Sequence, residues 1–170
     1  MPLVSIVVPS YQQGRYIRDT LDSILSQDFT DLECIVMDGG STDETVAVLQ
    51  SITDPRLMWV SEPDRGQSHA INKGLARATG AILSYLNSDD LLRPGAVTAV
   101  VRYFGQHPEA DLVYGDMDHV DGEGATFETV IAAPFDLPDT LAGRNSVNQP
   151  GTFWRREVGE RVGPFDESLH

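Results

Sequence analysis

Short apolar segments and amphipathic segments alternate along the first two thirds of the chain. The apolar segments have strand length and many β-branched residues, whereas the amphipathic segments repeat apolar residues at helical spacing. This alternation is typical of right-handed βαβ units, so the sequence predicts an α/β fold with a largely parallel sheet of five or more strands. Strands are predicted at residues 4–8, 33–37, 57–60, 81–86 and 111–114, and helices at residues 16–26, 42–51, 68–77 and 94–104.

Local signals also mark two helix boundaries. Ser41 followed by Glu44 predicts a capping box at the start of the second helix. Gly80 follows the third helix, where a glycine in the left-handed conformation commonly ends a helix. Past the last predicted strand the pattern weakens, with a turn at residues 121–124, a possible antiparallel strand at 126–131, and loop or short helix at 134–144.

Composition limits the class of protein. The chain has 170 residues and shows no linker or repeat, which predicts one domain. Its 26 acidic residues against 12 basic ones give a net charge of −14, which disfavours binding to nucleic acid. The single cysteine, Cys34, lies in an apolar segment and cannot form an intramolecular disulfide. With no signal peptide and no membrane-spanning segment evident, we expect a cytoplasmic location, while peripheral membrane association of a longer native protein stays open.

An acidic motif, Asn87-Ser-Asp-Asp90, directly follows the strand predicted at residues 81–86. Open α/β sheets bind ligands at the carboxyl ends of their strands. Mg²⁺ and Mn²⁺ prefer oxygen ligands and commonly take one or two carboxylates, with water and substrate phosphate in the other positions. The motif therefore predicts a divalent cation site, although by itself it is also typical of a solvated turn.

Polar clusters follow three other predicted strands as well: Pro9-Ser-Tyr11, Asp38-Gly-Gly-Ser-Thr-Asp43 and Glu62-Pro-Asp-Arg-Gly66. Because the carboxyl ends of parallel strands share one edge of the sheet, we expect the clusters to line a single cleft. There Tyr11 could stack on a base, Asp38 could accept hydrogen bonds from a base or ribose, and Arg65 could pair with phosphate. Two alternatives stay open: the Asp38 segment is equally typical of a loop, and Arg65 of a surface ion pair.

Six segments together form a pattern that covers nearly the whole chain in order and spacing. They are residues 4–11, 35–45, 65–74, 86–90, 149–154 and 162–169. This pattern resembles the family 2 glycosyltransferases. The resemblance implies the GT-A fold, a Rossmann-like three-layer α/β/α sandwich, in which residues 1–115 form the nucleotide-binding part and residues 116–170 the start of an incomplete acceptor-binding part.

The resemblance also implies an activity: inverting transfer of a sugar from a nucleoside-diphosphate sugar, with a UDP-sugar favoured, to a hydroxyl acceptor. The acceptor would be a sugar or a lipid-linked group, as in the synthesis of cell-envelope polysaccharides or glycoconjugates, and Mn²⁺ or Mg²⁺ would assist. Asn87 replaces the first acid of the family's Asp-x-Asp metal motif, which leaves Asp89 as the leading metal ligand and Asp90 as the second. The residues implied to contact the nucleotide are Pro9, Ser10, Tyr11, Asp38, Arg65, Gly66, Asn72, Asn87 and Ser88.

The catalytic base that the resemblance implies falls at the end of the pattern. In the family it is an acid a little downstream of the segment that residues 162–169 resemble, so we expect it beyond His170 and expect a truncated chain. Asp166 is a weaker candidate, because an acid after Gly-Pro-Phe is more typical of a turn. Asp116 could approach the acceptor, and Trp154 could stack on an acceptor sugar or pack in the core. A nucleotide-sugar-binding fragment without transfer activity is the alternative function.

Overall fold

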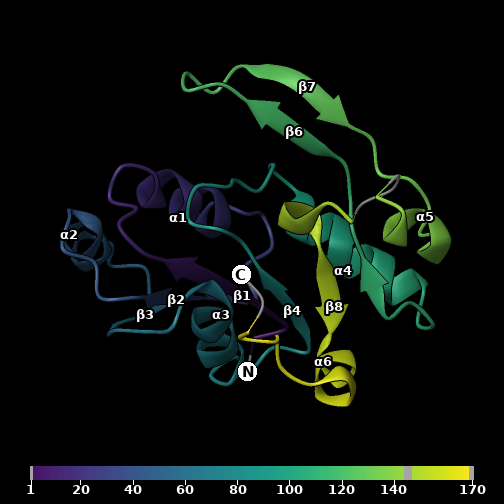
Figure 1. Ribbon diagram of the computed structural model, residues 1–170, viewed down its shortest axis with the longest axis horizontal. Coiled ribbons are helices and arrows are strands. Elements are labelled where there is room, and N and C mark those ends of the chain that lie inside the picture. The colour runs from purple at the N-terminus through teal and green to yellow at the C-terminus, as the bar shows by residue number, and fades with distance from the viewer. Residues whose placement is uncertain (1, 144–146, 169–170) are drawn as a thin grey trace.

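A six-stranded sheet forms the centre of the computed structural model, which describes residues 2–143 and 147–168 (Figure 1). The strand order is β3-β2-β1-β4-β8-β5, and β8 runs antiparallel to the other five strands. The predicted, mostly parallel sheet of at least five strands is thus confirmed. The strands are β1 (Val4–Ser10), β2 (Leu32–Asp38), β3 (Leu57–Ser61), β4 (Ile82–Tyr85), β5 (Leu112–Val113) and β8 (Phe153–Arg155).

Helices cover both faces of this sheet, which gives the three layers of the predicted sandwich. Strand β2 shows why, because its side chains alternate between two apolar cores. Cys34 and Val36 belong to the core under α1 (Ile17–Leu25), α2 (Thr45–Ser51) and α4 (Ala96–Gln106). Ile35 and Met37 belong to the core under α3 (Gln67–Leu75) and α6 (Arg156–Val162).

The carboxyl-terminal third departs most from the prediction. Strand β8 was not predicted, yet it pairs with both β4 and β5 and so completes the sheet. Three residues are too few to show an alternating pattern. The possible strand at 126–131 is confirmed as β7 (Thr126–Val130), which pairs with β6 (Met117–Val120) in a hairpin that extends away from the sheet (Figure 1). Two short helical segments follow, α5 (Leu137–Leu141) and the 3₁₀ turn η1 (Gln149–Gly151).

Parts of two predicted segments lie outside the described residues. These are residue 144, at the end of the predicted loop, and residues 169 and 170, at the end of the chain. Within the described ranges, none of the helices combines the length and the apolar character needed to cross a bilayer.

The capping box predicted at Ser41 and the left-handed glycine predicted at Gly80 are both wrong. Helix α2 begins at Thr45, whose backbone amide donates to the Asp43 side chain at 3.0 Å. The Ser41 hydroxyl donates to Asp38 and does not cap the helix. Gly80 is not in the left-handed region. A Cβ at Gly80 would lie 2.7 Å from the backbone nitrogen of Ser5, so the glycine is required by the close approach of β1.

One carboxylate ties three segments together at the amino-terminal edge of the sheet. Glu33 on β2 accepts hydrogen bonds from the Ser5 hydroxyl at 2.5 Å, the Thr79 amide at 2.7 Å and the Thr79 hydroxyl at 2.9 Å. Partial burial raises the pKa of Glu33, but the hydrogen bonds from Ser5, Thr79 and Gly80 outweigh it and lower the pKa below its usual value.

Because its folded-state pKa is lowered, Glu33 stabilises the protein above its unfolded pKa of about 4.3, and this contribution is lost as the pH falls through the folded value. Glu33→Gln is therefore expected to lower the free energy of unfolding by about 1 kcal/mol at pH 7, a modest loss because the group is partly exposed. Urea unfolding at pH 7 and at pH 3 measures this. The prediction would be contradicted if wild type and variant differed in their free energy of unfolding by the same amount at pH 7 and at pH 3.

Candidate functional site

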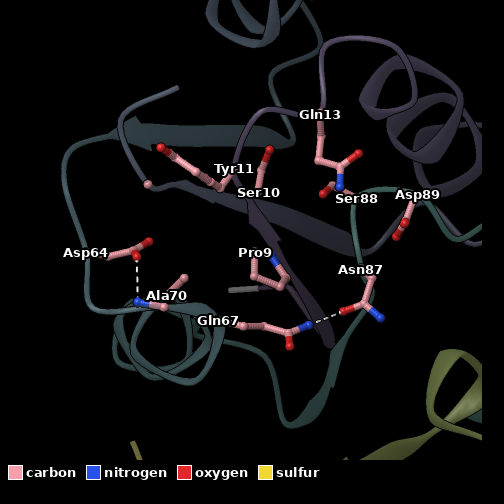
Figure 2. A pocket seen from close by; sticks show the side chains of 12 residues that line it. Pro9, Ser10, Tyr11, Gln13, Asp64, Gln67, Ala70, Asn87, Ser88 and Asp89 are labelled. Carbon is pink, nitrogen blue, oxygen red and sulfur yellow. Dashed lines mark hydrogen bonds between the residues drawn. The ribbon is translucent and has the colours of Figure 1, made fainter. Parts of the chain in front are cut away.

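A cavity of about 620 Å³ opens at the carboxyl ends of the parallel strands (Figure 2). Its volume lies within the range of small-molecule sites in proteins. Every one of the four strand-end clusters contributes to it, so the predicted single cleft is present. The residues that line it are Pro9, Ser10, Tyr11, Gln13, Gly39, Asp64, Gly66, Gln67, Ala70, Asn87, Ser88 and Asp89.

The end of β1 supplies two groups suited to ligand binding. Ser10 is only 5% exposed, and its hydroxyl has no hydrogen-bond partner within the described residues. Such unpaired buried hydroxyls are uncommon, and a ligand or a water molecule often supplies the hydrogen-bond partner. Tyr11 next to it is 62% exposed, so its ring is free to stack against a planar group.

Asn87 is the centre of a hydrogen-bond network at the other side of the pocket. Its side-chain oxygen accepts from Gln67 Nε2 at 2.6 Å, and its Nδ2 donates to Asp90 Oδ2 and to Gln149 Oε1, each at 3.1 Å. A carboxylate cannot donate to two acceptors. The network therefore explains why this position carries an amide instead of an acid.

The two acids of the motif have different positions. Asp89 is exposed and lines the pocket, whereas Asp90 is half-buried, bonds to Asn87 and does not line it. Burial raises the pKa of Asp90, and the nearby charge of Asp89 raises it further, although the hydrogen bond from Asn87 opposes both. The prediction of Asp90 as a ligand is thus not supported, because its carboxylate is turned to Asn87.

The donor set at this side of the pocket fits a hard divalent cation. No group of three or more His, Cys, Asp or Glu side chains within residues 2–143 and 147–168 is arranged to hold a metal. Mg²⁺ and Mn²⁺ do not require one, because they are commonly held by one or two carboxylates together with substrate phosphates and water. Asp89 would be the carboxylate here.

Asp38 has a structural role in the loop after β2, which is the alternative that the sequence left open. It is fully buried, and its carboxylate accepts hydrogen bonds from the amides of Gly40 and Ser41 and from the hydroxyls of Ser41 and Ser61. No part of Asp38 is accessible to a ligand. The predicted direct contact with a base or ribose is therefore wrong, and Asp38 instead fixes the loop that presents Gly39 to the pocket.

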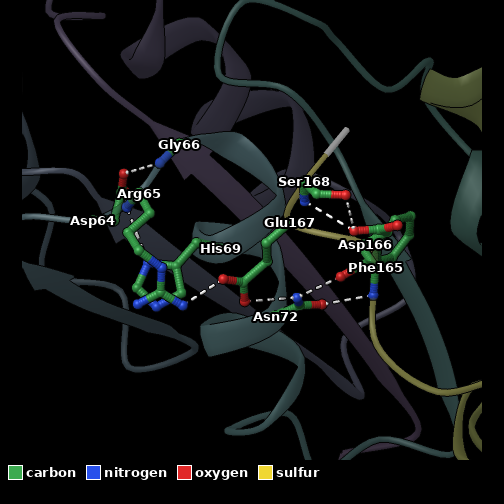
Figure 3. Close-up of polar contacts among 9 residues, drawn as sticks. All are labelled: Asp64, Arg65, Gly66, His69, Asn72, Phe165, Asp166, Glu167 and Ser168. Carbon is green, nitrogen blue, oxygen red and sulfur yellow. Dashed lines mark hydrogen bonds and ion pairs between the residues drawn. The ribbon is translucent and has the colours of Figure 1, made fainter. Parts of the chain in front are cut away.

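Arg65 and Asn72 do not line the pocket. Their side chains instead contact the segment after α6 (Figure 3). The Arg65 guanidinium pairs with Glu167. The Asn72 amide donates to the Phe165 carbonyl and to Glu167, and it accepts from the Phe165 amide. Hydrogen bonds from Asn72 and then Arg65 lower the pKa of Glu167. The surface ion pair that the sequence left open for Arg65 is therefore present, and the Asn72 amide is held by the segment after α6. Contact of either side chain with a nucleotide stays a prediction.

Three further candidates lie away from the pocket. Asp166 accepts two hydrogen bonds from Ser168, which lower its pKa, so it is a turn residue and a poor general base. Trp154 is 8% exposed and packs in the core beside α6, so it has no free face for an acceptor sugar and that prediction is wrong. Asp116 is exposed and accepts from the Ala132 amide at the base of the hairpin, and its role towards an acceptor stays a prediction.

The pocket also contains residues that were not predicted. Gln13, Asp64 and Gln67 line it. Asp64 stands in the Glu62-Pro-Asp-Arg-Gly66 cluster directly before Arg65. That cluster was the available signal, but spacing alone does not decide which of the two side chains turns into the pocket. The predicted nucleotide-contacting residues that do line the pocket are Pro9, Ser10, Tyr11, Gly66, Asn87 and Ser88.

Comparison with known proteins places the chain in a family. Residues 5–158 match the family described as "Glycosyl transferase family 2". The chain belongs to this family. Among curated relatives, a PGL/p-HBAD biosynthesis glycosyltransferase of Mycobacterium tuberculosis is 34% identical over 169 residues, which cover 97% of this chain and 64% of that protein. The chondroitin synthase of Escherichia coli is 36% identical over 126 residues, which cover 73% of this chain and 18% of the synthase.

Solved structures show the same fold. The mannosyltransferase PcManGT from Pyrobaculum calidifontis, in complex with GDP-Man and Mn²⁺, has a TM-score of 0.75 at 27% identity and covers 99% of this chain. TarS residues 1–349 of S. aureus give a TM-score of 0.77 at 23% identity, with 99% of this chain covered. These matches confirm the GT-A-type architecture. This family 2 chain spans about half of each of these two solved chains, 48% and 51%.

Proposed function

We propose that the chain binds a nucleoside-diphosphate sugar, with UDP-sugar or GDP-sugar as donor, together with Mn²⁺ or Mg²⁺, and that it transfers the sugar with inversion to a hydroxyl acceptor. In this proposal residues 1–115 hold the donor and residues 116–170 begin the acceptor-binding part. The observation that carries it is one pocket in a family 2 chain. There an exposed Tyr11 ring and the Asp89 carboxylate meet the Ser10 hydroxyl, which has no partner among the residues that the structure describes. PcManGT, with GDP-Man and Mn²⁺ bound, supports both the donor class and the cation.

In this proposal different pocket residues bind the base, the nucleoside, the diphosphate and the cation. Tyr11 stacks on the base, and the Ser10 hydroxyl offers a hydrogen bond to the nucleoside. Helix α3 begins at Gln67 on the pocket wall, so its first backbone N–H groups can bind the diphosphate. Asp89 would hold the cation, which when bound offsets the negative charge that develops on the diphosphate leaving group.

Inversion requires an acceptor hydroxyl to attack the anomeric carbon from the face opposite the leaving group, with a general base in hydrogen-bond reach. The relatives are named for PGL/p-HBAD biosynthesis and for chondroitin synthesis, which supports a sugar or lipid-linked acceptor. A second candidate is donor binding without transfer by these 170 residues. Binding without transfer is favoured by the position of Asp166. This side chain is the described candidate for the general base, and it is held in a turn by Ser168.

Titration calorimetry with UDP and with GDP tests the proposal. With Mn²⁺ present we expect a Kd below about 1 mM for at least one of the two, and removal of the ion with EDTA should weaken it at least about tenfold, a cost of about 1.4 kcal/mol. No measurable heat with either nucleotide would contradict the proposal. Turnover of a UDP-sugar or GDP-sugar by the 170-residue chain itself would exclude the binding-only candidate.

A further inference from the structure

Gly39 leaves a space in the pocket wall that the side chain of Asp64 fills. A Cβ at position 39 would lie 2.9 Å from Asp64 Oδ2, 3.2 Å from Asp64 Cγ and 3.3 Å from Tyr11 Cδ2. The backbone of Gly39 is not in the left-handed region, so its conformation does not itself require glycine. The missing side chain instead gives the Asp64 carboxylate its place beside the Tyr11 ring.

The two oxygens of Asp64 have different surroundings. Oδ1 accepts a hydrogen bond from the Gly66 amide at 2.8 Å, which fixes the carboxylate in its loop. Within the described residues, Oδ2 has no hydrogen-bond partner. One oxygen therefore anchors the side chain, and the other is available to a ligand in the pocket.

Asp64 and Asp89 lie on opposite sides of the pocket, with Tyr11 on the Asp64 side (Figure 2). A nucleoside diphosphate that places its phosphates near Asp89 would place its base near Tyr11 and Asp64. A base stacked on Tyr11 would then turn one edge towards Oδ2.

We propose that Asp64 recognises the base and selects uridine and guanosine nucleotides over cytidine and adenosine nucleotides, an inference that rests on the proposed donor binding. An ionised carboxylate only accepts hydrogen bonds. Uracil and guanine carry a ring N–H at the middle of their base-pairing edge, and this N–H can donate to the carboxylate. Cytosine and adenine carry a ring nitrogen lone pair at that point, which would face the carboxylate lone pairs.

A purely local role for Asp64, as a turn residue that accepts the Gly66 amide, makes a different prediction. Asp64→Asn keeps a side-chain oxygen for that amide, so the loop is retained under either role. Only recognition of the base makes the variant change its preference among nucleotides, because the asparagine amide can both donate and accept.

The matched pair UDP and CDP tests this, since the two nucleotides are nearly equal in size and charge. In calorimetry with Mn²⁺, the wild type is expected to bind UDP at least about tenfold more tightly than CDP, the effect of one hydrogen bond to a charged group. Asp64→Asn should reduce this ratio to about threefold or less. Asp22→Asn on the exposed side of α1 makes the same charge change away from the pocket and should keep the wild-type ratio.

A relocated carboxylate provides the second variant. Gly39→Asp alone would crowd Asp64 and should weaken UDP binding at least about tenfold, whereas Gly39→Asp combined with Asp64→Ala should restore binding with a preference for UDP over CDP. A wild-type UDP-to-CDP ratio in Asp64→Asn would overturn the inference and leave the proposed function standing. Failure of the wild type to bind any of UDP, GDP, CDP or ADP would overturn the proposed function itself.

Discussion

Asp89→Ala is expected to weaken binding of UDP or GDP in the presence of Mn²⁺ by about 100-fold or more. Loss of partners that only support a metal ligand commonly costs 10–100-fold in metal affinity, and Asp89 would be the ligand itself. It is the pocket-lining carboxylate after β4, and the adjacent Asp90 is turned to Asn87 and is not placed to replace it. Calorimetry of wild type and variant, each with Mn²⁺ and with EDTA, measures the effect, and the residual binding of the variant should be the same in both conditions.

Asp90→Ala provides the matched comparison, because it removes an adjacent carboxylate that is turned to Asn87. This variant should lose no more than about tenfold and should keep its dependence on Mn²⁺, since the loss acts only through the position of Asn87. If Asp90→Ala abolished the dependence on the ion while Asp89→Ala retained it, the assignment of the metal ligand would be reversed.

The fold was largely predictable because its elements have strong periodic signals. The β-branched segments and the apolar spacing of residues such as Ile17, Leu21 and Ile24 specify strands and helices through local physics. Strand β8 had no such signal, since its three residues are ordered by pairing with β4 and β5. Gly80 was recognised as special, but its reason was a contact with Ser5, which is 75 positions away in the chain.

The site was predictable in its location and less so in its members. Strand-end clusters must meet at one edge of a parallel sheet, which follows from topology alone. Whether a given polar side chain faces the pocket depends on partners that come from elsewhere. Arg65 is paired with a residue 102 positions away, whereas the preceding Asp64 is held by a local amide and faces the pocket. Composition and spacing do not distinguish these two outcomes.

Asp38→Ala is expected to lower the free energy of unfolding by about 3 kcal/mol or more, because it empties a fully buried position and leaves several part-buried donors without an acceptor. Within a total stability of about 5–15 kcal/mol, this would be a large loss. The donors come from the loop after β2 and from the end of β3, so both segments lose their common anchor. Urea unfolding followed by circular dichroism measures the change through the midpoint and the extrapolated free energy.

Asp38→Asn separates this structural role from the direct nucleotide contact that the sequence had suggested. Its side-chain oxygen can still accept from the Gly40 and Ser41 amides, so we expect a loss of about 1 kcal/mol, and UDP binding within about threefold of the wild type. A residue that touched the nucleotide would give the opposite pair of results, namely unchanged stability with binding lost. Because Asp38 is fully buried, a ligand could reach it only if the loop opened. Wild-type stability in Asp38→Ala would show that the four hydrogen bonds to this carboxylate do not hold the loop.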